Sequence, residues 1–260
     1  MKPLTDLRDA SRLRGLLFDL DDTLSTEGRL TAEAYAALER LQHAGRRTVL
    51  VTGRPAGWCD HIARMWPVDA VVGENGAFYF RYDGGRLRRR FVDDDAARAA
   101  KRARLGAIAE RILAAVPGSA LASDQGYRET DLAIDYCEDV TPLPLGEAER
   151  IAALMRETGL TAKVSSIHVN GWFGDYDKLA TAKLLFAEVF DANLDAVQAQ
   201  YAYAGDSPND APMFAYFENA VGVANVARFA GRLAAAPKYV TRREAGAGFS
   251  ELVARLLGTD

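Results

Sequence analysis

The chain has 260 residues, of which 49% are hydrophobic and 26% charged, and its net charge is −4 at pH 7. This composition is that of a globular protein with room for one or two domains, and it excludes a disordered or collagen-like chain. The acidic balance argues against a nucleic-acid partner, and no apolar stretch approaches the roughly 20 residues that span a bilayer. We therefore expect a cytoplasmic protein that binds neither nucleic acid nor a membrane.

The cysteines and histidines of the chain indicate no metal site of their own. Cys59 and Cys137 lie far apart and lack the spacing of metal ligands, so we expect two reduced, structural thiols. His43 and His61 lie in helix-like stretches, where a solvated surface position is the simpler interpretation.

The first third of the chain alternates predicted strands with predicted helices. Apolar runs at residues 15–18, 48–51 and 70–72 predict strands, and Thr31 is a good N-cap for the helix between the first two. Apolar runs separated by helices are typical of a parallel sheet that is covered on both faces.

The pattern changes after the glycine turn at residues 83–85. The predicted elements are then a strand at 86–92, a helix at 105–116, a half-buried strand at 131–136, a helix that ends at Gly159, and one or two strands within 164–172. The charged stretch at 86–90 is most simply a surface of this block. These elements predict a separate antiparallel α/β unit.

The alternating pattern resumes at Lys178. The predicted elements are a helix from Lys178, a strand at 201–204, a helix at 211–217, strands at 220–223 and 238–240, and a last helix from Ser250. The whole chain therefore predicts a doubly wound α/β core of residues 1–83 and 172–260, interrupted by an inserted α/β domain of residues 84–171.

Acidic and hydroxyl residues follow three of the core strands. Asp19 and Asp21 follow the first strand, Thr52-Gly53-Arg54 follows the second, and Gly205–Asp210 follows the strand at 201–204. Ligands of open α/β sheets bind beyond the carboxyl ends of the strands. Closely spaced carboxylates repel one another and need a cation, and oxygen ligands of this kind suit Mg²⁺. Taken alone, each segment is also compatible with a solvated loop.

A lysine near the return to the core is the remaining candidate. Lys178 opens a helix and is suited to bind a phosphate as a point charge, although a solvated helix start is the alternative. Lys183 lies more than a turn later and competes with it. We favour Lys178 because the start of the helix lies nearer to the strand ends.

In order, Asp19–Thr23, Thr52–Arg54, Lys178 and Gly205–Asp210 resemble the four motifs of the haloacid dehalogenase superfamily of phosphotransferases. The segment Glu74-Asn75-Gly76-Ala77 resembles the subgroup with a large α/β cap between the second and third motifs, which includes sucrose-phosphate, trehalose-phosphate and mannosyl-phosphoglycerate phosphatases. The resemblance covers roughly residues 12–82 and 173–258. Asp22 departs from it, because many family hydrolases have Gly there.

The resemblance implies a role for each motif residue. Asp19 would be the nucleophile that becomes an aspartyl phosphate, and Asp21 the general acid and base. Mg²⁺ would be held by Asp19, Asp206 and the backbone carbonyl of Asp21. The remaining phosphate oxygens would bind to Thr52, Gly53 and Lys178, with Asn209 and Asp210 in support.

The resemblance also implies that the inserted domain contacts the substrate. The candidates for this contact are Arg54, Arg128, His168 and Asn170. Around Arg128 and His168 polar residues alternate with apolar ones, so that one face either looks onto the site or lines the solvent side of the cap.

The function implied is Mg²⁺-dependent hydrolysis of a small phosphorylated metabolite, in particular a sugar phosphate, by a monomer or homodimer. The alternatives are a phosphomutase of the same superfamily and a metabolite-binding relative without catalysis. Because both acidic residues of the first motif are present, the chain favours an enzyme.

Overall fold

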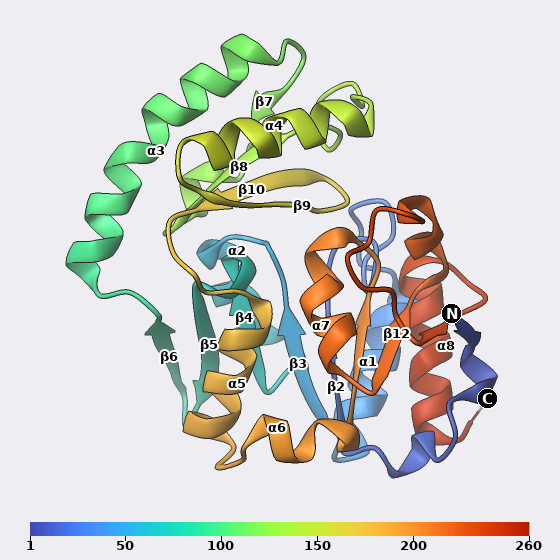
Figure 1. Ribbon diagram of the computed structural model, residues 1–260. Coiled ribbons are helices and arrows are strands. Elements are labelled where there is room, and N and C mark those ends of the chain that lie inside the picture. Colours follow the sequence, from blue (N-terminus) through green and yellow to red (C-terminus); the bar gives the residue numbers. More distant parts are fainter. Residues whose placement is uncertain (260) are drawn as a thin grey trace.

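A nine-stranded sheet forms the centre of the larger domain in the computed structural model, which describes residues 1–259 (Figure 1). Across the sheet the strands are β1 (Lys2–Pro3), β13 (Tyr239–Val240), β12 (Asn219–Gly222), β11 (Tyr201–Gly205), β2 (Gly15–Phe18), β3 (Arg47–Val51), β4 (Ala70–Gly73), β5 (Phe78–Asp83) and β6 (Arg86–Phe91). Neighbours from β1 to β4 are parallel, whereas β5 and β6 add an antiparallel hairpin at one edge.

Helices cover both faces of this sheet because successive residues of the apolar strands point to opposite sides. One face carries α1 (Ala32–His43), α2 (Ala56–Met65) and α8 (Ala245–Leu257), and the other carries α5 (Lys178–Val189), α6 (Leu194–Val197) and α7 (Ala211–Tyr216). In β2, Leu16 and Phe18 pack on the first group and Leu17 on the second. The predicted doubly wound core is thereby confirmed.

The smaller domain has its own sheet and its own apolar core. Its antiparallel strands are, in order, β7 (Ala120–Leu121), β8 (Asp131–Asp135), β10 (His168–Trp172) and β9 (Thr161–Val164), and its helices are α3 (Asp95–Ala115) and α4 (Leu145–Glu157). Residues such as Ile112, Ile134 and Ile151 join the helices to the sheet. Figure 1 shows this cap above the carboxyl ends of the core strands, with α4 on its outer side.

The cap begins later than the sequence predicts. The predicted boundary at residue 84 separates β5 from β6, yet the two strands pair along their whole length within the core sheet. The arginines at 86–90 therefore lie on an edge strand of the core and not on the cap, which is a correction to our prediction. The error has a plain cause, because a glycine turn ends a hairpin as readily as it ends a domain.

Three further differences concern strands and a helix. The strand β5 was not predicted, and β8 is buried along all five residues rather than half-buried, because the core covers the face that its helices leave free. The helix α8 begins at Ala245, before the predicted Ser250. Its first turn contains Gly246, where a Cβ atom would lie 2.6 Å from the backbone oxygen of Leu24, so that close packing requires a residue of low helix propensity.

Short 3₁₀ helices connect several elements. They are η1 (Leu4–Asp6), η2 (Ala10–Arg12), η3 (Glu74–Gly76), η4 (Gln125–Tyr127), η5 (Gln198–Gln200), η6 (Pro208–Asp210) and η7 (Ala224–Phe229). Within residues 1–259, none of the helices combines the length and the apolar character that a membrane crossing requires.

Candidate active site

The polar motifs meet at the carboxyl ends of the central core strands. The strands β11, β2 and β3 are adjacent and parallel, so Asp206, Asp19 and Thr52 leave their carboxyl ends side by side. Lys178 is the first residue of α5, on one face of the same sheet. The sequence prediction that these residues converge is met by the fold.

A cluster of three buried carboxylates lies at this edge. One oxygen each of Asp19, Asp206 and Asp210 falls within 4.8 Å of the others, and none of the three residues is more than 4% exposed. The donors are oxygen atoms alone, which is the set that Mg²⁺ prefers over softer metals. The residues present therefore fit the predicted magnesium ion.

The lysine of the site is Lys178. Its Nζ donates hydrogen bonds to Asp19 Oδ1 at 2.8 Å and to Asp210 Oδ1 at 2.7 Å. Burial alone lowers the pKa of Lys178, but the two carboxylates outweigh it and raise that pKa above its ordinary value. Lys183, in contrast, forms a partly exposed ion pair with Asp195. Of the two lysines that the sequence offered, it is Lys178 that lies at the carboxylate cluster, and its role in binding phosphate stays a prediction.

Asp210 holds the loop after β11 from behind. Its Oδ2 accepts hydrogen bonds from the backbone N–H groups of Asp206 at 3.0 Å and Ser207 at 3.2 Å, while its Oδ1 accepts those of Lys178 and of the Tyr203 hydroxyl. At Gly205 a Cβ atom would lie 2.5 Å from Asp210 Oδ2, so only glycine allows this approach. With both oxygens occupied, Asp210 has the supporting position that was predicted for it.

The carboxylates of this cluster are electrostatically unfavourable as anions. Burial raises the pKa of Asp19 to about 8, because the Lys178 ammonium offsets only part of the desolvation. Burial, together with the nearby Asp210 and Asp19, raises the pKa of Asp206 well above its ordinary value. A divalent cation would relieve this repulsion.

Two residues that hold Asp206 were not singled out from the sequence. The Thr23 hydroxyl donates to Asp206 Oδ1 at 3.2 Å, and Asn225 Nδ2 donates to Asp206 Oδ2 at 3.3 Å. Thr23 belongs to the first motif and was within reach of prediction. Asn225 follows β12 without any surrounding motif, and no local signal marks it.

Asp21 and Asp22 differ in what they contact. Asp21 Oδ1 accepts hydrogen bonds from Arg54 Nη2 at 2.9 Å and from Arg54 Nε at 3.0 Å. Asp22 has a φ of 54°, in the left-handed region. This conformation favours Gly, and Asp is among the few other residues that adopt it at modest cost.

Of the phosphate-binding candidates, Gly53 lines a narrow cleft under the cap. Gly53 and Asn209 lie there with Asp19 and Asp21, and the side chain of Thr52 is fully buried just behind them. The space between these residues and the cap has a volume of about 10 Å³, which is room for one water molecule. This space is too small for a phosphoryl group in the conformation described.

His168 and Asn170 face the core from the cap strand β10. Both line the cleft and both are 2% exposed, so the alternative of a solvent-facing position is wrong for them. His168 Nε2 lies 2.8 Å from Glu138 Oε2, although the two are not aligned as a hydrogen bond. Burial raises the pKa of Glu138, but His168 and Arg54 outweigh it and hold that pKa at about 2.

Arg54 joins the core to the cap. Besides Asp21, its guanidinium donates to Asp124 Oδ2 at 3.2 Å and makes a short hydrogen bond to Glu138 Oε1. The Arg54 side chain also lines a cavity of about 330 Å³ beside the cleft, together with Asp22, Glu138, Ser166 and Arg228. Its contact with a substrate stays a prediction.

Arg128 does not have the position that the sequence suggested. Its side chain is fully buried, Nη1 donates to the Gly53 carbonyl at 2.9 Å and to Asp131 Oδ1 at 3.0 Å, and Nη2 donates to Asp124 Oδ1 at 3.1 Å. A guanidinium engaged in this way has no group turned towards a substrate. The prediction that Arg128 contacts the substrate is corrected accordingly, and we assign it to fastening the cap to the loop after β3.

Glu74 makes a second attachment beside it. Its carboxylate accepts hydrogen bonds from the backbone N–H groups of Ala56 at 2.9 Å, Glu129 at 2.9 Å and Thr130 at 2.7 Å, and from the Thr130 hydroxyl. Burial raises the pKa of Glu74 to about 7. Four donors around one carboxylate tie the cap segment of Arg128 to the start of α2.

We expect Arg128→Ala to lower the free energy of unfolding by about 3 kcal/mol, because it leaves the buried Asp131 without its cation and leaves Asp124 paired with Arg54 alone. It should lower kcat/KM by the same factor for a sugar phosphate and for p-nitrophenyl phosphate. Urea denaturation and steady-state kinetics measure both effects, and the partly exposed Arg102, 3.7 Å from Glu129, provides the control Arg102→Ala. A loss confined to the sugar phosphate would restore a substrate contact for Arg128.

The remaining histidines and cysteines lie as predicted. His43 and His61 are exposed, and Cys59 and Cys137 are free thiols, the first buried and the second partly buried. Burial raises the pKa of the Cys59 thiol, so it stays protonated.

Comparison with known proteins gives a family match for part of the chain. Residues 16–101 match the model of the haloacid dehalogenase-like hydrolase family, and this segment includes Asp19, Asp21 and Thr52. Among curated proteins none matches the chain.

Solved structures share the fold over nearly the whole chain. The C-terminal domain of a trehalose-6-phosphate phosphatase from C. albicans has a TM-score of 0.69 at 15% identity, with 100% of both chains covered. The sucrose-phosphatase from Synechocystis has a TM-score of 0.63 at 16% identity, with 94% of this chain and 98% of that chain covered. A sugar phosphatase of haloacid dehalogenase subclass IIB has a TM-score of 0.60 at 14% identity, with 95% and 100% covered. The family match over residues 16–101 and the fold shared with these structures both agree with the resemblance seen in the sequence.

Proposed function

We propose that the protein is a Mg²⁺-dependent phosphomonoester hydrolase that forms an aspartyl phosphate. The observation that carries this proposal is the position of Asp19 at the carboxyl end of β2, with Lys178 Nζ 2.8 Å away and Asp206 beside it. A carboxylate held between a cation and a metal-binding oxygen cluster is suited to attack phosphorus.

The residues of this chain divide the reaction among them. Asp19 attacks the phosphorus atom, and Asp21 gives a proton to the leaving oxygen and later takes one from the hydrolytic water. Lys178 and the Thr52 hydroxyl bind the other phosphoryl oxygens and neutralise charge that grows in the transition state. Arg54 positions the Asp21 carboxylate in the cleft next to Asp19.

Asp19, Asp206 and the backbone carbonyl of Asp21 are the groups that would hold the ion. When bound, Mg²⁺ supplies positive charge against the phosphoryl oxygens. Asp210 acts on the ion only indirectly, because its two oxygens hold the loop and Lys178.

A sugar phosphate is the substrate class that we propose. The cavity of about 330 Å³ beside the cleft has the size of a small-ligand site and a polar lining that includes Asp22, Glu138 and Ser166. Two of the similar structures are described as phosphatases of sucrose phosphate and trehalose 6-phosphate, which supports the same class here.

The test is the release of inorganic phosphate by the purified full chain from a panel of phosphorylated sugars, glycolytic acids and nucleotides with Mg²⁺. We expect steady release from at least one sugar phosphate without any added bisphosphate. Isomerisation of the substrate that depends on a bisphosphate would instead identify a phosphomutase. Binding without turnover across the panel would identify a protein that has lost catalysis.

We expect activity to vanish in excess chelator and to return when Mg²⁺ is added beyond the chelator. The reason is that buried carboxylates without a counter-ion repel an anionic substrate. Phosphate release at set concentrations of free Mg²⁺ measures this dependence, with Zn²⁺ as the comparison metal. Full activity in chelator would contradict the assignment of the cluster.

A further inference from the structure

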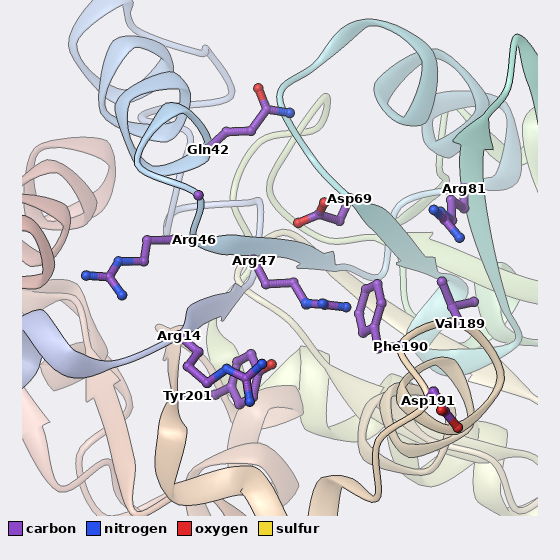
Figure 2. A pocket seen from close by; sticks show the side chains of 11 residues that line it. Arg14, Gln42, Arg46, Arg47, Asp69, Arg81, Val189, Phe190, Asp191 and Tyr201 are labelled. Carbon is purple, nitrogen blue, oxygen red and sulfur yellow. The ribbon is translucent and has the colours of Figure 1, made fainter.

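A larger cavity lies at the opposite ends of the core strands, away from the cap. It has a volume of about 640 Å³ and lies among the starts of β2, β3 and β11 and the end of α5 (Figure 2). The motif residues Asp19, Thr52 and Lys178 lie at the other ends of β2, β3 and α5. The cavity is therefore separate from the candidate active site by the length of these elements.

Arginines dominate the wall of this cavity. Arg14, Arg46, Arg47 and Arg81 line it, against the carboxylates Asp69 and Asp191. Arg81 pairs with Asp83 at 3.5 Å, whereas among residues 1–259 the other three have no carboxylate within 4.0 Å. Unneutralised guanidinium groups gathered in one concave surface attract anions, even though the chain as a whole is acidic.

The guanidinium groups of Arg46 and Arg14 each donate a hydrogen bond to the protein itself. Arg46 Nη2 donates to the Ser11 carbonyl at 2.6 Å, and Figure 2 shows its guanidinium turned away from the other arginines. Arg14 Nη1 donates to Gln200 Oε1 at 3.1 Å and keeps its other donors for a ligand.

The surroundings of Arg47 differ from those of these two arginines. Its guanidinium lies over the ring of Phe190 at 3.8 Å, which fixes its orientation, yet its side chain donates no hydrogen bond within residues 1–259. A partly buried guanidinium that lies over an aromatic ring and keeps its donors unused is suited to bind a phosphate or carboxylate group. This is the observation that carries the inference.

We propose that this cavity is a second binding site, which takes a small metabolite that carries phosphoryl or carboxylate groups. Arg47 and Arg14 bind the anionic group, and Phe190, Tyr201 and Gln42 contact the rest of the molecule. The volume exceeds that of inorganic phosphate and suits a ligand with a body as well as a charged group.

The test is calorimetric titration of the full chain with pyrophosphate, and separately with citrate, in the presence of chelator. Chelator removes the cation that an anion needs at the carboxylate cluster, so the arginine cavity is the attractive site that remains. We expect one site per chain for at least one of the two probes. The affinity of the double variant Arg14→Gln/Arg47→Gln should be lower by about tenfold or by a larger factor, because two charge-assisted contacts are lost.

The matched control is Arg8→Gln/Arg88→Gln, which removes the same charge from two exposed arginines outside the cavity. Circular dichroism and thermal unfolding verify that both double variants are folded. Equal affinities of the two double variants, or no binding of either probe to the wild-type chain at millimolar concentration, would overturn the proposal. Binding of pyrophosphate alone or of citrate alone identifies which oxyanion the site prefers.

Discussion

Asp19→Asn is expected to reduce phosphate release by roughly a thousandfold or more, because it removes the nucleophile that forms the covalent intermediate. The substitution is nearly isosteric, and the amide oxygen is still able to accept the hydrogen bond of Lys178. The loss should therefore appear in kcat while the protein remains folded.

The same variant should be as stable as the wild type, or more stable, in chelator at neutral pH. The folded chain keeps a proton on Asp19 up to a pKa of about 8, whereas the unfolded chain releases it near 3.8. Between these two values the folded state binds more protons, so the stability of the wild type falls as the pH rises. An asparagine has no proton to release, and that part of the pH dependence disappears.

Phosphate release and urea denaturation between pH 5 and about 8 measure both effects. Asp175→Asn is the control, since Asp175 is exposed and lies just before Lys178 without belonging to the cluster. Near wild-type turnover by a folded Asp19→Asn protein would remove Asp19 from the role of nucleophile.

Lys178→Met should lower the free energy of unfolding by about 3–5 kcal/mol in chelator, because it leaves the buried Asp210 without its counter-charge and Asp19 without its hydrogen-bond donor. Lys183→Met removes a partly exposed ion pair and should cost less than about 1 kcal/mol. The two substitutions are chemically identical, so the difference reports the environment alone.

Denaturation with and without Mg²⁺ tests whether the loss of stability comes from the charge of the carboxylate cluster. Since the ion itself neutralises part of the cluster, Mg²⁺ should recover part of the stability of Lys178→Met and little for Lys183→Met. Phosphate release should fall sharply for the first variant and stay near wild type for the second. Equal effects of the two substitutions would contradict the assignment of Lys178 to the site.

The sequence predicts this site well where one motif follows one strand. Asp19, Thr52 and Asp206 each come directly after an apolar run, and parallel strands bring such positions to the same edge. Lys178 was identified because it begins a helix. These inferences need only local patterns and one rule of topology.

Local sequence patterns do not predict which distant segments contact each other. Alternation shows which residues share a face of a strand, but not which neighbour covers that face, and so β8 was expected to be half-buried. For the same reason Arg128 was assigned to the substrate, although the Gly53 carbonyl and two acids occupy it. Asn225 reaches Asp206 from a loop with no motif at all.

The two edges of the nine-stranded sheet explain how so large a sheet avoids joining the sheets of other molecules. An unpaired edge strand offers its backbone groups to any other extended chain and so promotes aggregation. At one edge, β1 contains Pro3, which has no N–H to donate. At the other, β6 exposes four arginines, Arg86, Arg88, Arg89 and Arg90. Asp60 and Glu188 pair with the last two, so the positive charge that opposes the approach of a second copy comes from Arg86 and Arg88. The strand β6, which sequence reasoning assigned to the cap, thus protects the core sheet from self-association.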